Sequence, residues 1–311
     1  MKMALLSLSL LFGGGIGAGD ESSLSILHKG EELERIQVDE FLHVVGKPFV
    51  NLEAVEKLSR ELSEQVEKPS VNAKIGKSGE IVPGKSGSNL YQEKFQVELI
   101  KALYHPDQKK VSIPMMTVHP KVDSELIAHI RTQQIGQYAT YFNSNNEERT
   151  HNIKLSSDAI DNHVVFPNEV FSFNEVVGKR TEEKGYKPAP VIVKGEVSEG
   201  IGGGICQVSS TLFNAVDYAR IKIVERYSHS KQVPYVPPGR DATVSWWGPD
   251  FTFKNNYNEP LLIRSNVIGG TLRIVIYSAS GVDVKPRDIP DASRELPDEI
   301  HIDDLGKGRN E

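Results

Sequence analysis

The stretch Gly202–Val216, GGGICQVSSTLFNAV, holds the only cysteine among the 311 residues of the chain. Three glycines precede Cys206, and apolar residues follow it at spacings of three and four. This spacing places them on one face of a helix. The stretch therefore predicts a glycine-rich turn and then a helix that ends near Arg220, with Cys206 in its first turn.

A cysteine in the first turn of a helix lies beside unpaired N–H groups and the positive end of the helix dipole. Both favour a thiolate and lower the pKa of the thiol. Gly202, Gly203 and Gly204 remove side chains just before Cys206, which lets backbone or a substrate approach closely. Gln207 follows directly and can supply an amide donor to a developing oxyanion.

A nucleophilic thiol also needs a base. The strand-like run IKIVERYSHS contains His229, 23 residues after Cys206, and Asp241 stands before the next predicted strand, ATVSWWG. The order cysteine, histidine, acid occurs in transglutaminase-like cysteine enzymes, in which the histidine takes the thiol proton and the acid orients the imidazole. The residues leave a second interpretation open. Free cysteine is among the most buried residue types, and Cys206 then only packs in the core.

Composition narrows the function classes. Hydrophobic residues make up 38% and charged residues 25% of the chain, and the formal net charge is -6. These values predict a soluble globular protein and give no electrostatic case for a nucleic-acid partner. The sequence has no HExxH or CxxC motif and no P-loop lysine after its glycines, so we expect neither a metal nor a cofactor.

The N-terminus predicts export. Lys2 precedes an uncharged apolar run, Met3–Ala18, which is shorter than the ~20 residues of a spanning helix and ends in small residues. We interpret residues 1–19 as a signal peptide cut near Ala18, with an uncleaved membrane anchor as the alternative. The expected location is extracytoplasmic, secreted or attached to the cell wall or membrane.

The pattern of the rest predicts two domains and an α+β fold. Residues 20–125 predict a small α/β module: a helix capped by Asn51, a hairpin over Val71–Val82, a second helix and an edge strand. Residues 136–280 predict a mostly antiparallel β domain with a few helices and a hairpin at Gly269-Gly270. Residues 281–311, charged and proline-bearing, predict a disordered tail. Adjacent Trp246 and Trp247 would face opposite ways on a strand, which places one of them in the core.

Two blocks of the second domain, FSFN…VGKRT…GY…AP and GGGICQVSSTL, resemble the VanW family, named from accessory proteins of B-type vancomycin resistance clusters. The similarity runs from about residue 136 to 276 and implies a protein of the Gram-positive cell envelope. The first 100 residues are similar to a peptidoglycan-binding module that also precedes some L,D-transpeptidase domains with a cysteine nucleophile. The family positions that match are Phe171–Asn174, Gly178, Arg180, Thr181, Gly185, Tyr186, Gly202–Thr211, Asn214, His229, Tyr235, Pro237, Gly239 and Asp241.

Residues and resemblance together give the working hypothesis of an exported protein whose partner is peptidoglycan or its precursors. It acts on peptide or amide bonds of the wall, as a hydrolase or transpeptidase, with Cys206 as nucleophile, His229 as base and Asp241 as orienter. The expected substrate contacts are Gly202, Gly203, Gly204, Gln207, Ser209, Asn174 and Arg180. The alternative is a non-catalytic module that binds peptidoglycan or assists wall assembly.

Overall fold

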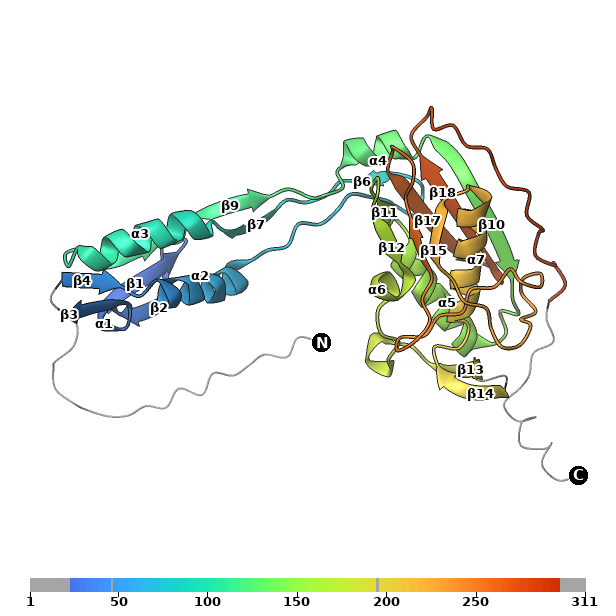
Figure 1. Ribbon diagram of the computed structural model, residues 1–311, viewed down its shortest axis with the longest axis horizontal. Helices are drawn as coiled ribbons and strands as arrows, with labels where there is room; N and C mark the ends of the chain where they lie inside the picture. The colour runs from blue at the N-terminus through green and yellow to red at the C-terminus, as the bar shows by residue number, and fades with distance from the viewer. Residues whose placement is uncertain (1–22, 46, 194–195, 297–311) are drawn as a thin grey trace, which may run out of the picture. The chain divides into compact units, whose positions relative to one another are not determined.

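The computed structural model describes residues 23–45, 47–193 and 196–296, so the predicted signal peptide lies outside the described residues. The chain divides into two compact units (Figure 1). The N-terminal unit comprises Met1–Val71 and Lys85–Pro120, and the C-terminal unit comprises Asn72–Gly84 and Lys121–Glu311. The sheets are small and mostly antiparallel, and the predicted α+β class is confirmed.

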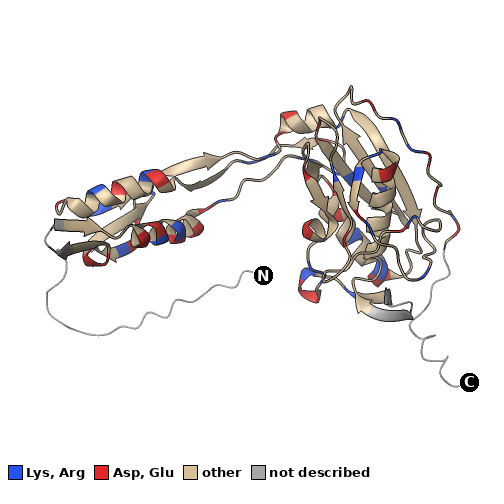
Figure 2. Cartoon of the chain, viewed as in Figure 1, with Lys and Arg blue, Asp and Glu red and all other residues tan. Residues whose placement is uncertain are grey.

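The N-terminal unit packs two amphipathic helices against a three-stranded sheet of order β2-β1-β8. The predicted cap of the first helix is confirmed, because the side chain of Asn51 accepts a hydrogen bond from the N–H of Ala54. Charged residues of both signs lie along α2 and α3 (Figure 2), while the apolar faces of both helices lie in the core. The elements are β1 (Ser23–His28), β2 (Glu31–Gln37), α1 (Val38–Phe41), β3 (Leu42–Val45), β4 (Lys47–Val50), α2 (Leu52–Val66), β7 (Gly87–Leu90), α3 (Gln92–Tyr104), β8 (Lys110–Ser112) and β9 (Met115–Val118).

The C-terminal unit is built on a four-stranded antiparallel sheet of order β10-β18-β17-β11. The predicted hairpin joins β17 to β18 through Gly269 and Gly270, both of which have positive φ. A second sheet has the order β12-β16-β15. The strands are β10 (Gln133–Tyr141), β11 (Val164–Val165), β12 (Val170–Ser172), β13 (Pro188–Val193), β14 (Glu196–Ile201), β15 (Lys222–Glu225), β16 (Thr252–Lys254), β17 (Leu261–Ile268) and β18 (Thr271–Ser278).

Helices α5 and α7 cover one face of the four-stranded sheet (Figure 1). Helix α7 is the predicted cysteine helix, and nearly all of its residues are buried. Strand β10 lies close against α7 at Gly136, where an added Cβ would be 2.4 Å from the carbonyl oxygen of Ala215. The helices of this unit are α4 (Ser124–Ile130), α5 (Glu147–Ile160), α6 (Phe173–Val177) and α7 (Ile205–Tyr218), with a 3₁₀ turn at Glu182–Lys184.

The hairpin of β5 (Lys74–Ile75) and β6 (Ile81–Val82) forms as predicted, but it belongs to the C-terminal unit and not to a module spanning 20–125. Ile75 packs in a cluster that includes Ile127 and Leu262. The side-chain amide of Asn162 bonds both the N–H and the carbonyl of Ile75. These contacts join segments far apart in the chain, so no local pattern predicts them.

The run ATVSWWG is not a strand, contrary to the prediction. Residues 241–250 form an irregular loop in which the N–H groups of Ser245 and Gly248 bond the carbonyls of Pro249 and Ser245. Trp246 and Trp247 are 37% and 86% exposed, so neither lies in the core. A strand pattern alone does not reveal the turn that Gly248-Pro249 imposes.

Residues 281–296 lack regular structure but lie against the C-terminal unit, which differs from the disordered tail that composition predicted. The Tyr138 hydroxyl donates to the carbonyl of Pro290, and Ala292 is buried. Scattered apolar residues therefore anchor the segment despite its charge. Residues 297–311 lie outside the described part of the chain.

Substitution of Gly136 tests the packing of β10 on α7. Gly136→Ala places a methyl group against helix backbone, which cannot rotate away, so we expect a loss of roughly 1–3 kcal/mol in the free energy of unfolding. Denaturant unfolding of the full chain measures it. Gly248→Ala is the control, because its new Cβ meets only the movable hydroxyl of Ser245. Equal stability of Gly136→Ala and the unsubstituted protein would contradict the close approach.

Candidate active site

Cys206 is the second residue of α7, directly after the turn formed by Gly202–Gly204. The residue as a whole is intermediate between buried and exposed. The N–H groups of Ile205 and Gln207 donate to the carbonyls of Gly202 and Gly204. The N–H of Cys206 has no acceptor among residues 23–45, 47–193 and 196–296. The first turn therefore keeps one backbone donor beside the thiol.

His229 and Asp241 form a tight pair from two loops. The Asp241 carboxylate accepts hydrogen bonds at Oδ2 from the Nδ1 and from the backbone N–H of His229, both at 2.6 Å. Their side chains are only 6% and 10% exposed. Because Nδ1 is bound to Asp241, the nitrogen left for Cys206 is Nε2. Cys206 lies near this pair, because its sulfur contacts Thr243 and Val244 of the loop that carries Asp241.

The electrostatics of the three residues favour an ion pair. Burial raises the pKa of the Cys206 thiol, but the hydrogen bond and charge of His229, together with Val244 and Thr243, outweigh burial and bring that pKa below its ordinary value. Burial lowers the pKa of His229, while its bonds to Asp241 and Cys206 raise the pKa to about 9. The pair is thus biased toward thiolate and imidazolium.

A loop carrying Asp241 is fastened to α7 by Ser210. The Ser210 hydroxyl accepts a hydrogen bond from the N–H of Ala242 at 2.8 Å and donates to the carbonyl of Cys206 at 2.7 Å. Further along the loop, the Val244 carbonyl lies 3.6 Å from the Cys206 sulfur. Arg226 also contacts this loop: its Nε donates to the carbonyl oxygen of Asp241 at 2.7 Å.

Arg180 and Asn174 border the same loop. The Asn174 amide donates to the carbonyls of Ser245 and Pro249, and its Oδ1 accepts from Nη1 of Arg180 at 2.7 Å. Nη2 of Arg180 is buried without a partner among the described residues. Burial lowers the pKa of Arg180, although the charge of Cys206 is among the groups that oppose this shift. Of the side chains that the sequence predicted as substrate contacts, Arg180 therefore has a buried N–H group without a partner among the described residues. Asn174 holds the other end of its guanidinium group.

A family model described as "VanW like protein" matches residues 148–277, which contain Cys206, His229 and Asp241. The uncharacterized protein YoaR of Bacillus subtilis (strain 168) is 53% identical over 284 residues, or 91% of this chain and 94% of that protein. The chain belongs to the VanW family. It is also similar to the vancomycin B-type resistance protein VanW of Enterococcus faecalis (strain ATCC 700802 / V583), at 29% identity over 115 residues, 35% of this chain and 42% of that protein. No solved structure matches it.

In this VanW-family chain, Gln207 does not face a substrate. It is fully buried; its Oε1 accepts from Arg149 at 2.6 Å, and its Nε2 donates to Thr140 and to the carbonyl of Tyr141. Both N–H groups of the amide are used within the domain, which leaves no donor of Gln207 for the predicted oxyanion role. The Cys206 backbone N–H is better placed for that role. Consecutive residues of a helix point about 100° apart. The side chain of Gln207 therefore points to the sheet, whereas that of Cys206 points to the site.

Ser209 and the three glycines also serve the packing of the VanW domain. The buried Ser209 hydroxyl donates to the carbonyl of Ala242 at 2.6 Å. An added Cβ at Gly203 would lie 2.6 Å from the carbonyl of Pro190 in β13. Gly202 and Gly204 have positive φ. The contact at Gly203 is the close approach of backbone that the sequence suggested as one reason for the glycines.

Sequence reasoning gave no role to Ser210 or Arg226. Ser210 lies four residues after Cys206, so the double serine one turn beyond the cysteine was a usable signal. No local signal identified Arg226. Within the described part of the chain, no group of three or more histidine, cysteine, aspartate or glutamate residues could hold a metal ion. No helix there is long and apolar enough to cross a membrane.

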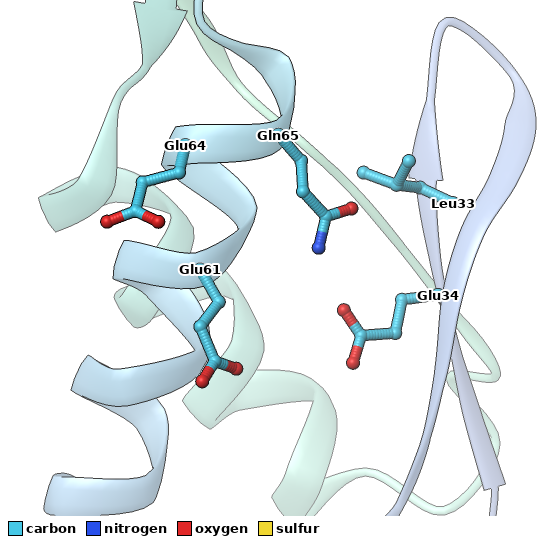
Figure 3. Close-up of a pocket in the computed structure, with 5 residues that line it drawn as sticks. All are labelled: Leu33, Glu34, Glu61, Glu64 and Gln65. Atoms are coloured by element: carbon cyan, nitrogen blue, oxygen red, sulfur yellow. The ribbon is translucent and has the colours of Figure 1, made fainter. Parts of the chain in front are cut away.

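The N-terminal unit has a hollow of about 460 Å³ between β2 and α2 (Figure 3). Burial, together with the nearby charge of Glu61, raises the pKa of Glu34. The five lining residues include no cysteine, serine or histidine. They are Leu33, Glu34, Glu61, Glu64 and Gln65.

The pH dependence of alkylation tests the coupling of Cys206 to His229. Iodoacetamide reacts with the thiolate, so its rate should titrate below the free-cysteine pKa of ~8.5. His229→Ala removes the positive partner and should raise the apparent pKa. Asp241→Asn should lower the pKa of His229, seen in its NMR titration. Cys206 that reacts only after denaturation, or a profile that His229→Ala leaves unchanged, would contradict the pairing.

Ser210→Ala tests the link between α7 and the Asp241 loop. It leaves the buried N–H of Ala242 unsatisfied, so we expect a loss of about 1–3 kcal/mol in the free energy of unfolding and a higher thiol pKa. The matched control is Ser156→Ala in the same unit, because the buried Ser156 hydroxyl has no partner among the described residues. The link is refuted if the two variants unfold alike and alkylate alike.

Proposed function

We propose that the chain is a cysteine-dependent acyl transferase that acts on peptide or amide bonds of peptidoglycan outside the cytoplasm. The single observation that carries the chemistry is the buried His229–Asp241 pair beside Cys206, in which His229 Nδ1 lies 2.6 Å from Asp241 Oδ2 and the imidazole lowers the pKa of Cys206. A buried packing cysteine needs no oriented histidine. Covalent acyl transfer requires a nucleophile, a base and a group that orients the base, and Cys206, His229 and Asp241 supply these three residue types.

In the first half of the reaction, the Cys206 sulfur attacks the carbonyl carbon of the scissile bond. The carbonyl oxygen becomes negative, and the free N–H of Cys206 stabilises it. Nε2 of the His229 imidazolium gives its proton to the leaving nitrogen, the C–N bond breaks, and a thioester remains. Asp241 keeps the imidazole oriented and stabilises its charge.

In the second half, water or an amine of another peptide attacks the thioester. His229 takes a proton from the attacking group, and the carbon–sulfur bond breaks to restore the thiolate. Water gives hydrolysis, and an amine gives transpeptidation. The site geometry suits both, because both use the same thioester and the same base.

The assignment to the wall is supported by the family and by the N-terminus. The Enterococcus faecalis relative is described as a vancomycin B-type resistance protein. The predicted signal peptide directs the chain out of the cytoplasm, where peptidoglycan is the polymer with accessible peptide bonds. On this proposal the N-terminal unit docks on peptidoglycan, as its resemblance implies.

A non-catalytic binding module is the second candidate. It is favoured by the fact that Gly203, Gln207 and Ser209, which we expected to contact a substrate, are engaged in internal packing. On that alternative, Cys206 is a structural residue, and its substitution changes stability without removing any reaction.

Mass spectrometry of stem peptides incubated with the full chain separates the candidates. The enzyme should yield either hydrolysed or cross-linked peptides. Cys206→Ala should abolish both products, and His229→Ala should slow them by about 10²–10⁴-fold. Ser156→Ala, outside the site, should retain activity. Product formation by Cys206→Ala at the unsubstituted rate would exclude the mechanism. Peptide binding without turnover in the unsubstituted protein would establish the binding module instead.

A further inference from the structure

A hollow of about 560 Å³ lies on the face of the four-stranded sheet that α5 and α7 leave uncovered. Strand register defines this face. Arg264 pairs with Val275, and Asn266 pairs with Arg273, so these four side chains point the same way. The intervening residues point to the helices: the Ser265 hydroxyl, for example, bonds Ser157 of α5.

Ile75 and Gly79 of the β5–β6 hairpin and Arg131 at the end of α4 also line the hollow. Nη1 of Arg131 donates to the carbonyl of Gly79 at 3.0 Å, which ties α4 to the hairpin. All these residues belong to the C-terminal unit, so the hollow is contained in one compact body.

Arginines from three different elements line this hollow, and the guanidinium group of each is hydrogen-bonded to a neighbouring residue. Nη2 of Arg273 lies 2.7 Å from Oε1 of Gln137, and Nε of Arg264 lies 2.8 Å from Oδ1 of Asp161. Gln137 and the Gly79 carbonyl are neutral, so they do not compensate the charges of Arg273 and Arg131. Only the charge of Arg264 is compensated, by Asp161.

The rest of the lining adds no negative charge. Among the described residues that line the hollow there is no aspartate or glutamate. Glu80 of the adjacent turn directs its carboxylate back to the N–H of Ser78. Two positive charges therefore remain in a chain whose formal net charge is -6. A local excess of this kind favours an anionic ligand.

The hollow also has apolar walls, from Ile75, Ile268, Val275 and Tyr277. Its volume is in the range of small-molecule sites, roughly 300–1,000 Å³. A guanidinium offers paired N–H donors that match the two oxygens of a carboxylate or phosphate. Side chains already held by Gln137 and Gly79 lose less freedom when a ligand binds.

We propose that this hollow is a binding site for a ligand that carries two oxyanion groups, carboxylate or phosphate, with Arg131 and Arg273 each engaging one group. Arg264 supports the site from the floor of the sheet. The site is on the opposite face of the sheet from α7 and Cys206, so it is independent of the acyl-transfer proposal.

Isothermal titration of the full chain with inorganic pyrophosphate and, separately, with citrate tests this site. We expect binding of at least one probe that weakens as ionic strength rises. Arg273→Gln and Arg131→Gln should each raise the dissociation constant roughly tenfold. Arg294→Gln, an exposed arginine outside the hollow, is the matched control for charge and should leave the constant unchanged.

Binding of pyrophosphate alone assigns the site to phosphate ligands, and binding of citrate alone assigns it to carboxylate ligands; both outcomes support it. Cys206→Ala should bind as the unsubstituted protein does, whether or not the chain proves to be an acyl transferase. Because Arg131 and Arg273 lie on different elements, one variant remains informative if the other does not fold. Absence of binding by both probes at millimolar concentration overturns the proposal. It is also overturned if Arg294→Gln weakens binding as much as Arg273→Gln does.

Discussion

The hydroxyl of Ser210 is the contact on which the geometry of the site depends. It bonds the carbonyl of Cys206 in the first turn of α7 and the N–H of Ala242 in the neighbouring loop. Asp241, the residue before Ala242, orients His229. One buried hydroxyl thus helps to set the position of Asp241 relative to Cys206, because a buried hydroxyl that is bonded on both sides cannot shift without losing a hydrogen bond.

Burial explains why this site uses so many internal hydrogen bonds. Helix α7 is enclosed by the sheet, α5 and the loop 241–250, yet it carries polar residues such as Gln207, Ser209 and Asn214. Each of them is bonded to a partner from another segment or to the helix backbone. The same exclusion of water strengthens the attraction between the Cys206 thiolate and the His229 imidazolium. That attraction is what opposes the cost of burying the thiolate.

The four-stranded sheet separates two chemically different surfaces of the C-terminal unit. Its helix-covered face is apolar and leads to α7, the cysteine and the histidine. Its other face carries Arg264 and Arg273 and is partly covered by the β5–β6 hairpin. Strand alternation makes this division possible, since neighbouring residues of β17 and β18 serve opposite faces. The candidate site around Cys206 and the arginine-lined hollow therefore lie on opposite faces of one sheet.

The sequence by itself determined the local elements and the choice of residues for the site. Helical spacing and the Asn51 cap predicted α2, the glycine pair predicted the β17–β18 hairpin, and the single cysteine after three glycines located the start of α7. Chain order was enough to select His229 and Asp241, which the structure brings together, although their catalytic roles remain proposals. These features depend on short-range backbone geometry, which neighbouring residues control.

Only the tertiary structure decided which polar groups are free. Gln207 and Ser209 look available in the sequence, but partners from β10 and the loop 241–250 occupy them, whereas the N–H of Cys206 has no acceptor among the described residues. The irregular course of 241–250, the placement of the β5–β6 hairpin and the meeting of three arginines were likewise absent from any local pattern. The physical reason is that a hydrogen bond or a charge cluster depends on which distant segments become neighbours, and packing of the whole unit determines this.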